Sequence, residues 1–326
     1  MQRRSFTAAF LSGCMVPLLP SFASAQGTWP NKPVKFIIPY AAGGQPDVTA
    51  RALSIKLSEE LGQPIVVDNR PGAGGSVAYN TLIQVQPNDG HAFIVSDAAM
   101  LSISPLISKT TNYKLGKDLL PVALIGRSSL FLAAHPKTGV NNLQEFVATV
   151  RKRPGEFTYG SSGIGSNHHL TMEALKAALN LDIRHVPYRG SGQSTPALIS
   201  GQVDFSITAL PSIAAFVQHG QVKLLGANSA VRSKLAPDVP SLSELVPGFD
   251  FAPMLVVLGA PGTPQAAIDR LSREIAQIAK LPEVIKALNT AAVEPTPGGP
   301  AELTRELNRE MAAMAKAASV AKLQAE

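Results

Sequence analysis

The chain has 326 residues, of which 45% are apolar, 16% charged and 6% aromatic. This length favours two domains that each bury a core. Glycine and proline, 26 each, are too few for a low-complexity chain, which argues against intrinsic disorder. The net charge of +6 becomes +4 when a leader carrying Arg3 and Arg4 is removed, since Lys and Arg fall from 29 to 27 against 23 acids; so mild an excess attracts anions without making a nucleic-acid surface.

Residues 1–25 have the features of an export signal. Arg3-Arg4 forms a basic start, a mostly apolar stretch follows, and Ala23-Ser24-Ala25 is a small-residue cleavage pattern before Gln26. We therefore expect an exported protein. The two arginines resemble the twin-arginine signal, although they also suit the ordinary secretory route.

The single cysteine, Cys14, lies inside this leader. The mature chain would then have no cysteine, which excludes disulfides, cysteine-bound zinc and a cysteine nucleophile. Leu11-Ser12-Gly13-Cys14 offers a lipoprotein processing site as an alternative, but the apolar stretch before it is very short.

The first part of the chain alternates short apolar runs with helical patterns. Residues 34–38 are typical of a buried strand, and Asp47 is the expected N-cap of a helix with Leu53, Leu57 and Leu61 on one face and Gly62 at its end. The next elements are a strand at 65–67, a helix at 76–84 and a strand at 92–95. This order predicts a parallel, doubly wound α/β sheet.

The pattern restarts near residue 130. The expected strands are 130–134, 157–159, 183–186, 203–207 and 224–227, with helices at 167–178, from Pro196 and at 212–219. A crossing connection at 237–248 and a strand at 255–260 follow, then helices capped by Thr263 and beginning near Pro282 and Pro300. A chain that leaves one α/β unit and returns to it forms two lobes around a cleft: 26–127 with 250–326, and 128–249.

Ligand chemistry is expected in loops at the carboxyl ends of strands. The loop at 39–47 contains Gly43 and Gly44 at a helix start, where backbone N–H groups can approach an anion. The loop at 159–169 adds three serine hydroxyls and two flexible glycines at another helix start. On these residues alone, both loops can equally be turns with helix caps.

The second loop lacks two familiar motifs. Gly163 and Gly165 have no third glycine to complete a dinucleotide fingerprint, and Ile164 stands where a nucleophile elbow around Ser162 needs glycine.

The histidines favour structural roles. His168 and His169 are adjacent, so their side chains point in different directions on a helix, which suits capping better than metal binding. His185 lies within a strand and is expected to be a core residue. We expect no metal and no cofactor.

A set of motifs then occurs in a characteristic order. They are Trp29-Pro30 with Pro33, the 39–47 loop with Arg51, Asn69-Arg70-Pro71-Gly72-Ala73-Gly74-Gly75, residues 160–169, Val186-Pro187-Tyr188-Arg189-Gly190, Gly201-Gln202-Val203-Asp204, Pro237-Asp238-Val239-Pro240 and Ala260-Pro261-Gly262-Thr263-Pro264. Together they resemble the tripartite tricarboxylate transporter substrate-binding proteins, also called the Bug family.

The resemblance implies a periplasmic receptor, not an enzyme, whose lobes close on a small organic carboxylate and deliver it to a two-component membrane permease. It implies no nucleic acid partner, and we expect a monomer. The ligand contacts carried over by motif position are Tyr40, Ala42, Gly43 and Gly44 in the first loop and Ser161, Ser162, Gly163, Gly165 and Ser166 in the second.

Three segments depart from the family pattern. Ser96-Asp97-Ala98-Ala99 replaces a Thr/Ser-Ser-Gly-type sequence, so we expect Asp97 to repel a second ligand carboxylate and to meet a positive or hydroxyl group. Phe205-Ser206-Ile207-Thr208-Ala209 replaces a common Phe-Asp-Asn-like ending. Within it, Thr208 is a candidate contact for the distal end of the ligand, or simply a strand end. The usual tryptophan near 251–254 is absent, so ligand preference does not transfer.

Two other functions stay open. A carboxylate-sensing partner of a signalling system would differ only in what it contacts. A hydrolase would use the same cleft, but the sequence identifies no positioned base for the serine-rich loop.

Overall fold

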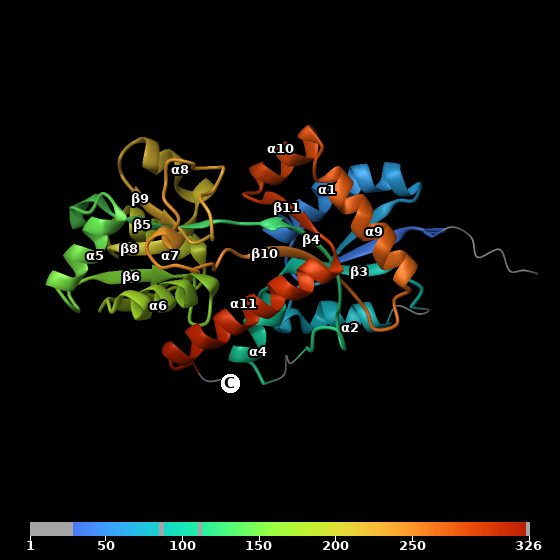
Figure 1. Cartoon of the computed structure of the whole chain (residues 1–326), viewed down its shortest axis with the longest axis horizontal. Coiled ribbons are helices and arrows are strands. Elements are labelled where there is room, and N and C mark those ends of the chain that lie inside the picture. Colours follow the sequence, from blue (N-terminus) through green and yellow to red (C-terminus); the bar gives the residue numbers. More distant parts are fainter. Residues whose placement is uncertain (1–28, 85–87, 110–112, 324–326) are drawn as a thin grey trace, which may run out of the picture.

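The structure is a computed structural model that describes residues 29–84, 88–109 and 113–323. Its strands form two sheets in two lobes, with helices packed around each (Figure 1). This confirms the predicted two-lobed α/β class. The predicted leader, with Cys14 and the cleavage before Gln26, lies outside the described residues.

The first sheet has the strand order β11-β4-β10-β3-β1-β2. Its strands are β1 (Val34–Ile38), β2 (Ile65–Asn69), β3 (Ala92–Asp97), β4 (Leu120–Arg127), β10 (Met254–Gly259) and β11 (Glu294–Gly298). The predicted β2, β1 and β3 are parallel, but β10 is antiparallel to both β3 and β4, and β11 is antiparallel to β4. The sheet is therefore mixed rather than parallel throughout.

The sequence did not indicate β4 or β11. Pro295 and Pro297 make β11 an improbable strand by composition, yet it lies at the sheet edge, where a missing N–H donor is tolerated. β4 pairs with β10, which lies more than 100 residues further along the chain.

The start of the first helix differs from the prediction. Gly44, not Asp47, is the N-cap of α1 (Gln45–Leu61), and Asp47 lies in the first turn. Its carboxylate there accepts a hydrogen bond from the Gly43 N–H (2.9 Å) and pairs with Arg51 (2.9 Å). An acid suits both the cap and the first turn, so its type alone does not separate the two positions. Gly62 ends α1 in the left-handed region, as predicted.

The other first-lobe helices are α2 (Ser76–Gln84), α3 (Ala99–Ser102), α4 (Ser104–Ile107), α9 (Gln265–Ile278), α10 (Pro282–Thr290) and α11 (Pro300–Val320). The starts of α10 and α11 agree with the prediction. Thr263 is not the cap of α9: Pro264 occupies that position, and the Thr263 hydroxyl donates to the Ala260 carbonyl (2.8 Å) instead.

The second sheet has the order β7-β6-β8-β5-β9. Its strands are β5 (Leu130–Ala134), β6 (Thr158–Ser161), β7 (Arg184–Pro187), β8 (Phe205–Ala209) and β9 (Lys223–Ala227), and its helices are α5 (Leu143–Lys152), α6 (Asn167–Leu179), α7 (Ser191–Ile199) and α8 (Leu210–Gln218). β7, β6 and β8 are parallel, and β5 is antiparallel to its neighbours. Pro196 does not start a helix as expected; it lies inside α7, where the burial of Ala197 and Leu198 stabilises the helix that Pro196 weakens.

Three segments join the lobes (Figure 1). β4 leads into β5, and the chain returns from β9 to β10. α11 begins in the first lobe, where Leu303 and Leu307 are in the core, and its end adds Met314, Ala317 and Ala318 to the core of the second. The first sheet thus uses strands from 34–127 and 254–298, whereas the second-lobe core also draws on the C-terminal helix.

Candidate functional site

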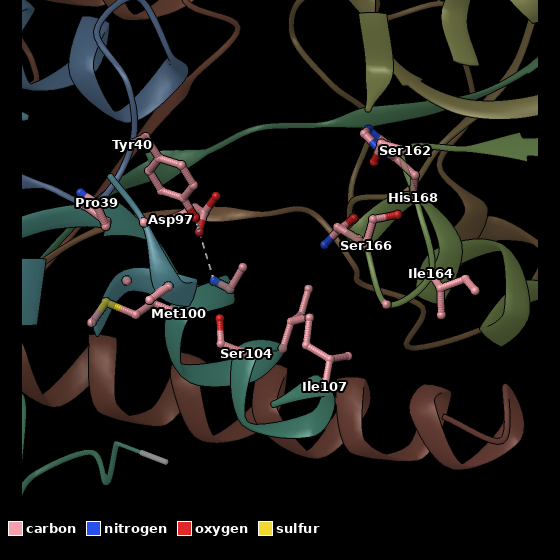
Figure 2. Close-up of a pocket in the computed structure, with 17 residues that line it drawn as sticks. Pro39, Tyr40, Asp97, Met100, Ser104, Ile107, Ser162, Ile164, Ser166 and His168 are labelled. Atoms are coloured by element: carbon pink, nitrogen blue, oxygen red, sulfur yellow. Dashed lines mark hydrogen bonds between the residues drawn. The ribbon is translucent and has the colours of Figure 1, made fainter. Parts of the chain in front are cut away.

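A cavity of about 570 Å³ lies between the lobes, a volume that suits a small organic ligand. We call its first-lobe side the first wall: Pro39, Tyr40, Gly72, Ala73, Gly75 and Asp97. The floor comprises Ala99, Met100, Ile103, Ser104 and Ile107. The second wall comprises Ser162, Ile164, Gly165, Ser166, Asn167 and His168. Figure 2 shows Tyr40 and Asp97 facing Ser162, Ser166 and His168 across the gap, above α3 and α4.

The first wall is built around Tyr40 and Asp97, which follow β1 and end β3. The Tyr40 hydroxyl donates to Asp97 Oδ1 (2.8 Å), and the Ala99 N–H donates to the same oxygen (3.1 Å). Burial raises the pKa of the Asp97 carboxyl, although both hydrogen bonds favour its ionised form. Burial, and then the charge of Asp97, also raise the pKa of Tyr40. The tyrosine therefore stays a neutral donor.

A polar network anchors the backbone of Tyr40. The Asn69 side-chain amide donates to the Tyr40 carbonyl (3.1 Å), and its oxygen accepts from Arg51 (3.2 Å). Arg51 in turn pairs with Asp47. Residues that the sequence placed in two separate motifs thus hold one loop.

Ala42, Gly43 and Gly44, the other predicted contacts of the first loop, are not among the residues that line the cavity. Ala42 and Gly43 are exposed, and Gly43 has the left-handed φ of 82°. Gly44 caps α1. Of the four contacts predicted in this loop, the structure places Tyr40 on the cavity and the other three beside it; contact of any of them with a ligand stays a prediction.

The second wall is the N-terminus of α6. Ser166 is its N-cap: its hydroxyl accepts from the His169 N–H (3.2 Å) and donates to the Gly163 carbonyl (2.7 Å). The first N–H groups of a helix have no partner within it, so those of Asn167 and His168 are the natural donors to an anion here.

Gly165 lies against the floor of the cavity. Its φ is 76°, and a Cβ placed on it would be 2.6 Å from Ile107 Cγ2 of the floor. Gly163, with a φ of 126°, turns the chain between Ser161 and the helix but does not line the cavity. The two glycines therefore have different roles. Gly163 allows the turn of the loop, and Gly165 allows the loop to pack closely against Ile107.

The structure contains two serine–histidine pairs that the sequence did not predict. Ser161 Oγ is 2.7 Å from His185 Nε2, and the Ser162 hydroxyl is hydrogen-bonded to His168 Nδ1. His185 also stacks between the rings of His169 and Tyr159, with centroids 4.2 and 4.7 Å away. Burial lowers the pKa of both His168 and His185 to about 4. Both rings are therefore neutral near pH 7.

Such pairs catalyse acyl transfer when the serine is reachable and an acid orients the histidine. Ser161 is fully buried, and its hydroxyl also lies 3.2 Å from the Gly163 carbonyl. Ser162 and His168 do line the cavity. Within the described part of the chain, no carboxylate is hydrogen-bonded to the ring of either paired histidine. Each pair thus supplies the serine and the histidine of a hydrolytic triad without a described acid that orients the histidine.

Thr208 lies at the end of β8, buried, with its hydroxyl 3.1 Å from that of Thr195. It does not line the cavity between the lobes. Its predicted role as a distal contact has no support from this position, whereas the strand-end alternative matches it.

The sequence missed the floor of the cavity. α3 and α4 have four residues each, too few to show a helical period. Met100, Ile103 and Ile107 give this surface an apolar character that suits a hydrocarbon chain between two polar ends.

Two searches of the described residues bear on other functions. In residues 29–84, 88–109 and 113–323 there is no group of three or more side chains of the metal-binding kind. No helix in those same ranges has the length and apolar character needed to span a membrane.

Comparison with known proteins identifies a family and several relatives. The family model for the tripartite tricarboxylate transporter family receptor matches residues 49–318. BugT of Bordetella pertussis is 32% identical over 270 residues, which cover 82% of this chain and 82% of that protein. Among solved structures, R. palustris Rpa4515 with adipate is 30% identical with a TM-score of 0.75, covering 91% of this chain and 100% of that one. MatC from Rhodopseudomonas palustris with bound malate is 26% identical with a TM-score of 0.68, covering 89% and 99%.

Proposed function

Since the chain belongs to the tripartite tricarboxylate transporter receptor family, we propose that it is a periplasmic receptor that binds a small organic carboxylate between its lobes and delivers it to a membrane permease. Lobe closure around the ligand is part of this proposal.

The observation that carries the proposal is the second wall. α6, a helix of 13 residues, begins at the cavity: its N-cap Ser166 and its first residues Asn167 and His168 line it, beside Ser162. A helix N-terminus favours an anion. The Ser162 hydroxyl adds a donor to a carboxylate when His168 carries its proton on Nδ1 and donates to the serine oxygen, whereas the hydroxyl hydrogen of Ser166 is already donated to Gly163. The lining contains no Lys or Arg, so these dipoles are the features that attract negative charge.

The relatives support the same ligand class. Two structures with recognisable sequence identity contain adipate and malate, which are both small organic carboxylates. The apolar floor under the polar walls is compatible with such molecules.

The arrangement of the walls supports closure. The two walls come from different lobes, and Gly165 of one lobe lies against Ile107 of the other. A hinge motion at the connecting segments would change the distance between the walls without altering either one.

Binding is tested on protein that lacks residues 1–25. We expect adipate, malate or another small carboxylate to raise the melting temperature; at 100 times its dissociation constant a ligand stabilises the native state by about 2.7 kcal/mol. Ser162→Ala should lower the affinity for the best ligand by about 10- to 150-fold, because it removes one charge-assisted hydrogen bond to the ligand carboxylate. Ser319→Ala, at an exposed position near the end of α11, is the matched control.

The outcomes separate the candidate functions. If no small carboxylate binds, the receptor proposal fails. If the ligand is recovered chemically altered, the Ser162–His168 pair becomes the leading candidate for a hydrolytic site. If the ligand binds unchanged but uptake of it by cells is the same with and without this protein, the sensing role is favoured over transport.

A further inference from the structure

The first wall contains a charge that the second wall does not balance. Among the residues that line the cavity, Asp97 is the one aspartate, and there is no glutamate, lysine or arginine. Figure 2 shows its carboxylate at the edge of the gap, on the opposite side from Ser166 and His168. A ligand held by its carboxylate at α6 would therefore extend its other end toward an acid.

Only half of the Asp97 carboxylate is engaged by protein. Oδ1 accepts both the Tyr40 hydroxyl and the Ala99 N–H, while within the described ranges no protein donor is bonded to Oδ2. A carboxylate has about four acceptor positions on its two oxygens. Oδ2 is thus a free acceptor at the first wall.

Among residues 29–84, 88–109 and 113–323, no lysine or arginine forms an ion pair with Asp97. Behind the wall, Ser102 donates to a second carboxyl, Glu310 (2.6 Å), which is close enough to Asp97 to be affected by its charge. Arg127, the nearby cation, is already paired with Asp250 (3.2 Å) and Glu306 (2.5 Å). A second ligand carboxylate would add to this unbalanced negative charge, whereas an ammonium group would compensate it.

We propose that the first wall selects an amino carboxylate over a dicarboxylate, with the ligand ammonium donating to Asp97 Oδ2 while its carboxylate lies at the N-terminus of α6. This inference rests on the proposed receptor function and names the ligand class of the same cavity. It distinguishes this chain from its relative with adipate, whose ligand has a carboxylate at both ends.

A purely structural role for Asp97 makes a different prediction. Holding Tyr40 and the first turn of α3 requires only Oδ1, and an asparagine offers the same oxygen. Asp97→Asn therefore keeps both hydrogen bonds and replaces the free acceptor by an N–H₂ donor. If Asp97 were only structural, this change would leave ligand preference unaltered.

The experiment compares ligands that differ only at the far end. The pairs are 4-aminobutanoate with succinate, 5-aminopentanoate with glutarate and 6-aminohexanoate with adipate, measured by calorimetry near pH 7.5. For the best-fitting length we expect wild type to bind the amino member about 10- to 150-fold more tightly. Asp97→Asn should abolish or reverse this ratio. Asp269→Asn, on the exposed face of α9, makes the same charge change far from the cavity and should leave the ratio unaltered.

The failures are distinguishable. Equal binding of the two members, tighter binding of the diacid by wild type, or a ratio unchanged in Asp97→Asn overturns the inference. So does binding of hexanoate or malate without binding of any amino member. If none of these carboxylates binds, it is the receptor function that fails. The wild-type ratio decides the preference even if Asp97→Asn does not fold.

Discussion

The two walls of the cavity carry opposite kinds of titratable group. Asp97 lies in the first wall with Glu310 behind it, and burial raises the pKa of both, that of Glu310 to about 7. His168 lies in the second wall with His185 behind the loop, and burial lowers the pKa of both to about 4. One cause produces both directions, because burial disfavours the charged form whether that form is an anion or a cation.

The comparison shows how one cavity can favour different ends of a ligand without a lysine or arginine. In the proposed binding mode, the helix N–H groups and Ser162 of the second wall hold an anion, and the histidines of this wall are neutral. The first wall has an acceptor and acids. The predictions below test this contrast, from the largest expected effect to the smallest.

Glu310→Gln should change how stability depends on pH. Between pH 4.5, the ordinary value, and about 7, the native state binds a proton that the unfolded chain does not. The free energy of unfolding of wild type therefore falls as pH rises through this window, by about 3 kcal/mol in total. The glutamine variant should lack this contribution of Glu310, while a fall of the same sign from Asp97 remains. Urea unfolding from pH 4 to 8, followed by fluorescence of the single tryptophan, Trp29, in the first lobe, would show it; identical slopes in the two proteins would contradict it.

His168→Asn should have the opposite sign. Between pH 6.5 and about 4 the unfolded chain binds a proton that the native histidine does not. Stability of wild type is therefore lost as pH falls through this window, by about 3 kcal/mol from His168, and the asparagine variant should lose correspondingly less. The same unfolding series, followed by circular dichroism, measures it. His185 remains, so some acid sensitivity should persist; an unaltered acid limb would show that His168 is not responsible.

Gly165→Ala should be more harmful than Gly43→Ala. Both positions have a left-handed backbone, which costs alanine about 1–3 kcal/mol. At Gly43 nothing lies within 4 Å of the added Cβ, whereas at Gly165 the Cβ meets Ile107. Gly165→Ala should therefore also weaken ligand binding. Adding Ile107→Ala should restore part of that loss. Thermal unfolding and calorimetry measure the two effects; equal losses at both glycines would argue against close approach of the lobes.

Ser166→Ala should cost about 1 kcal/mol of stability, because it removes the side-chain cap of α6. The corresponding N-cap of the first wall, Gly44, has no side chain to lose, and Gly44→Ser should alter stability by only a few tenths of a kcal/mol. Thermal unfolding of the two variants provides the comparison. A harmless Ser166→Ala would indicate that the hydroxyl contributes little to the helix start.

The sequence predicted elements well where the signal is local. The apolar run of β1, the helix α2, the left-handed glycine after α1 and the proline starts of α10 and α11 all depend on residues within a few positions of one another. It also identified Asp97 as a departure and the loop at 159–169 as a helix start. It failed for β4 and β11, which are stabilised by strands distant in the chain, and for the four-residue helices α3 and α4.

The side-chain pairs at the candidate site show the same contrast between local and distant signals. Tyr40 and Asp97 are 57 residues apart, and Ser161 and His185 are 24 apart, so no motif joins them. Three serines of one loop looked equivalent, yet one is buried against a histidine, one faces the cavity and one caps a helix.

By itself, the sequence determined the α/β class, the two glycine- and serine-bearing loops and the position of Asp97 after the third predicted strand. The tertiary structure decided which hydroxyls line the cavity, which residues form its floor and in which direction each pKa moves. The physical reason is that periodicity, caps and turns depend on neighbours along the chain, whereas burial and hydrogen-bond partners depend on which distant segments pack together.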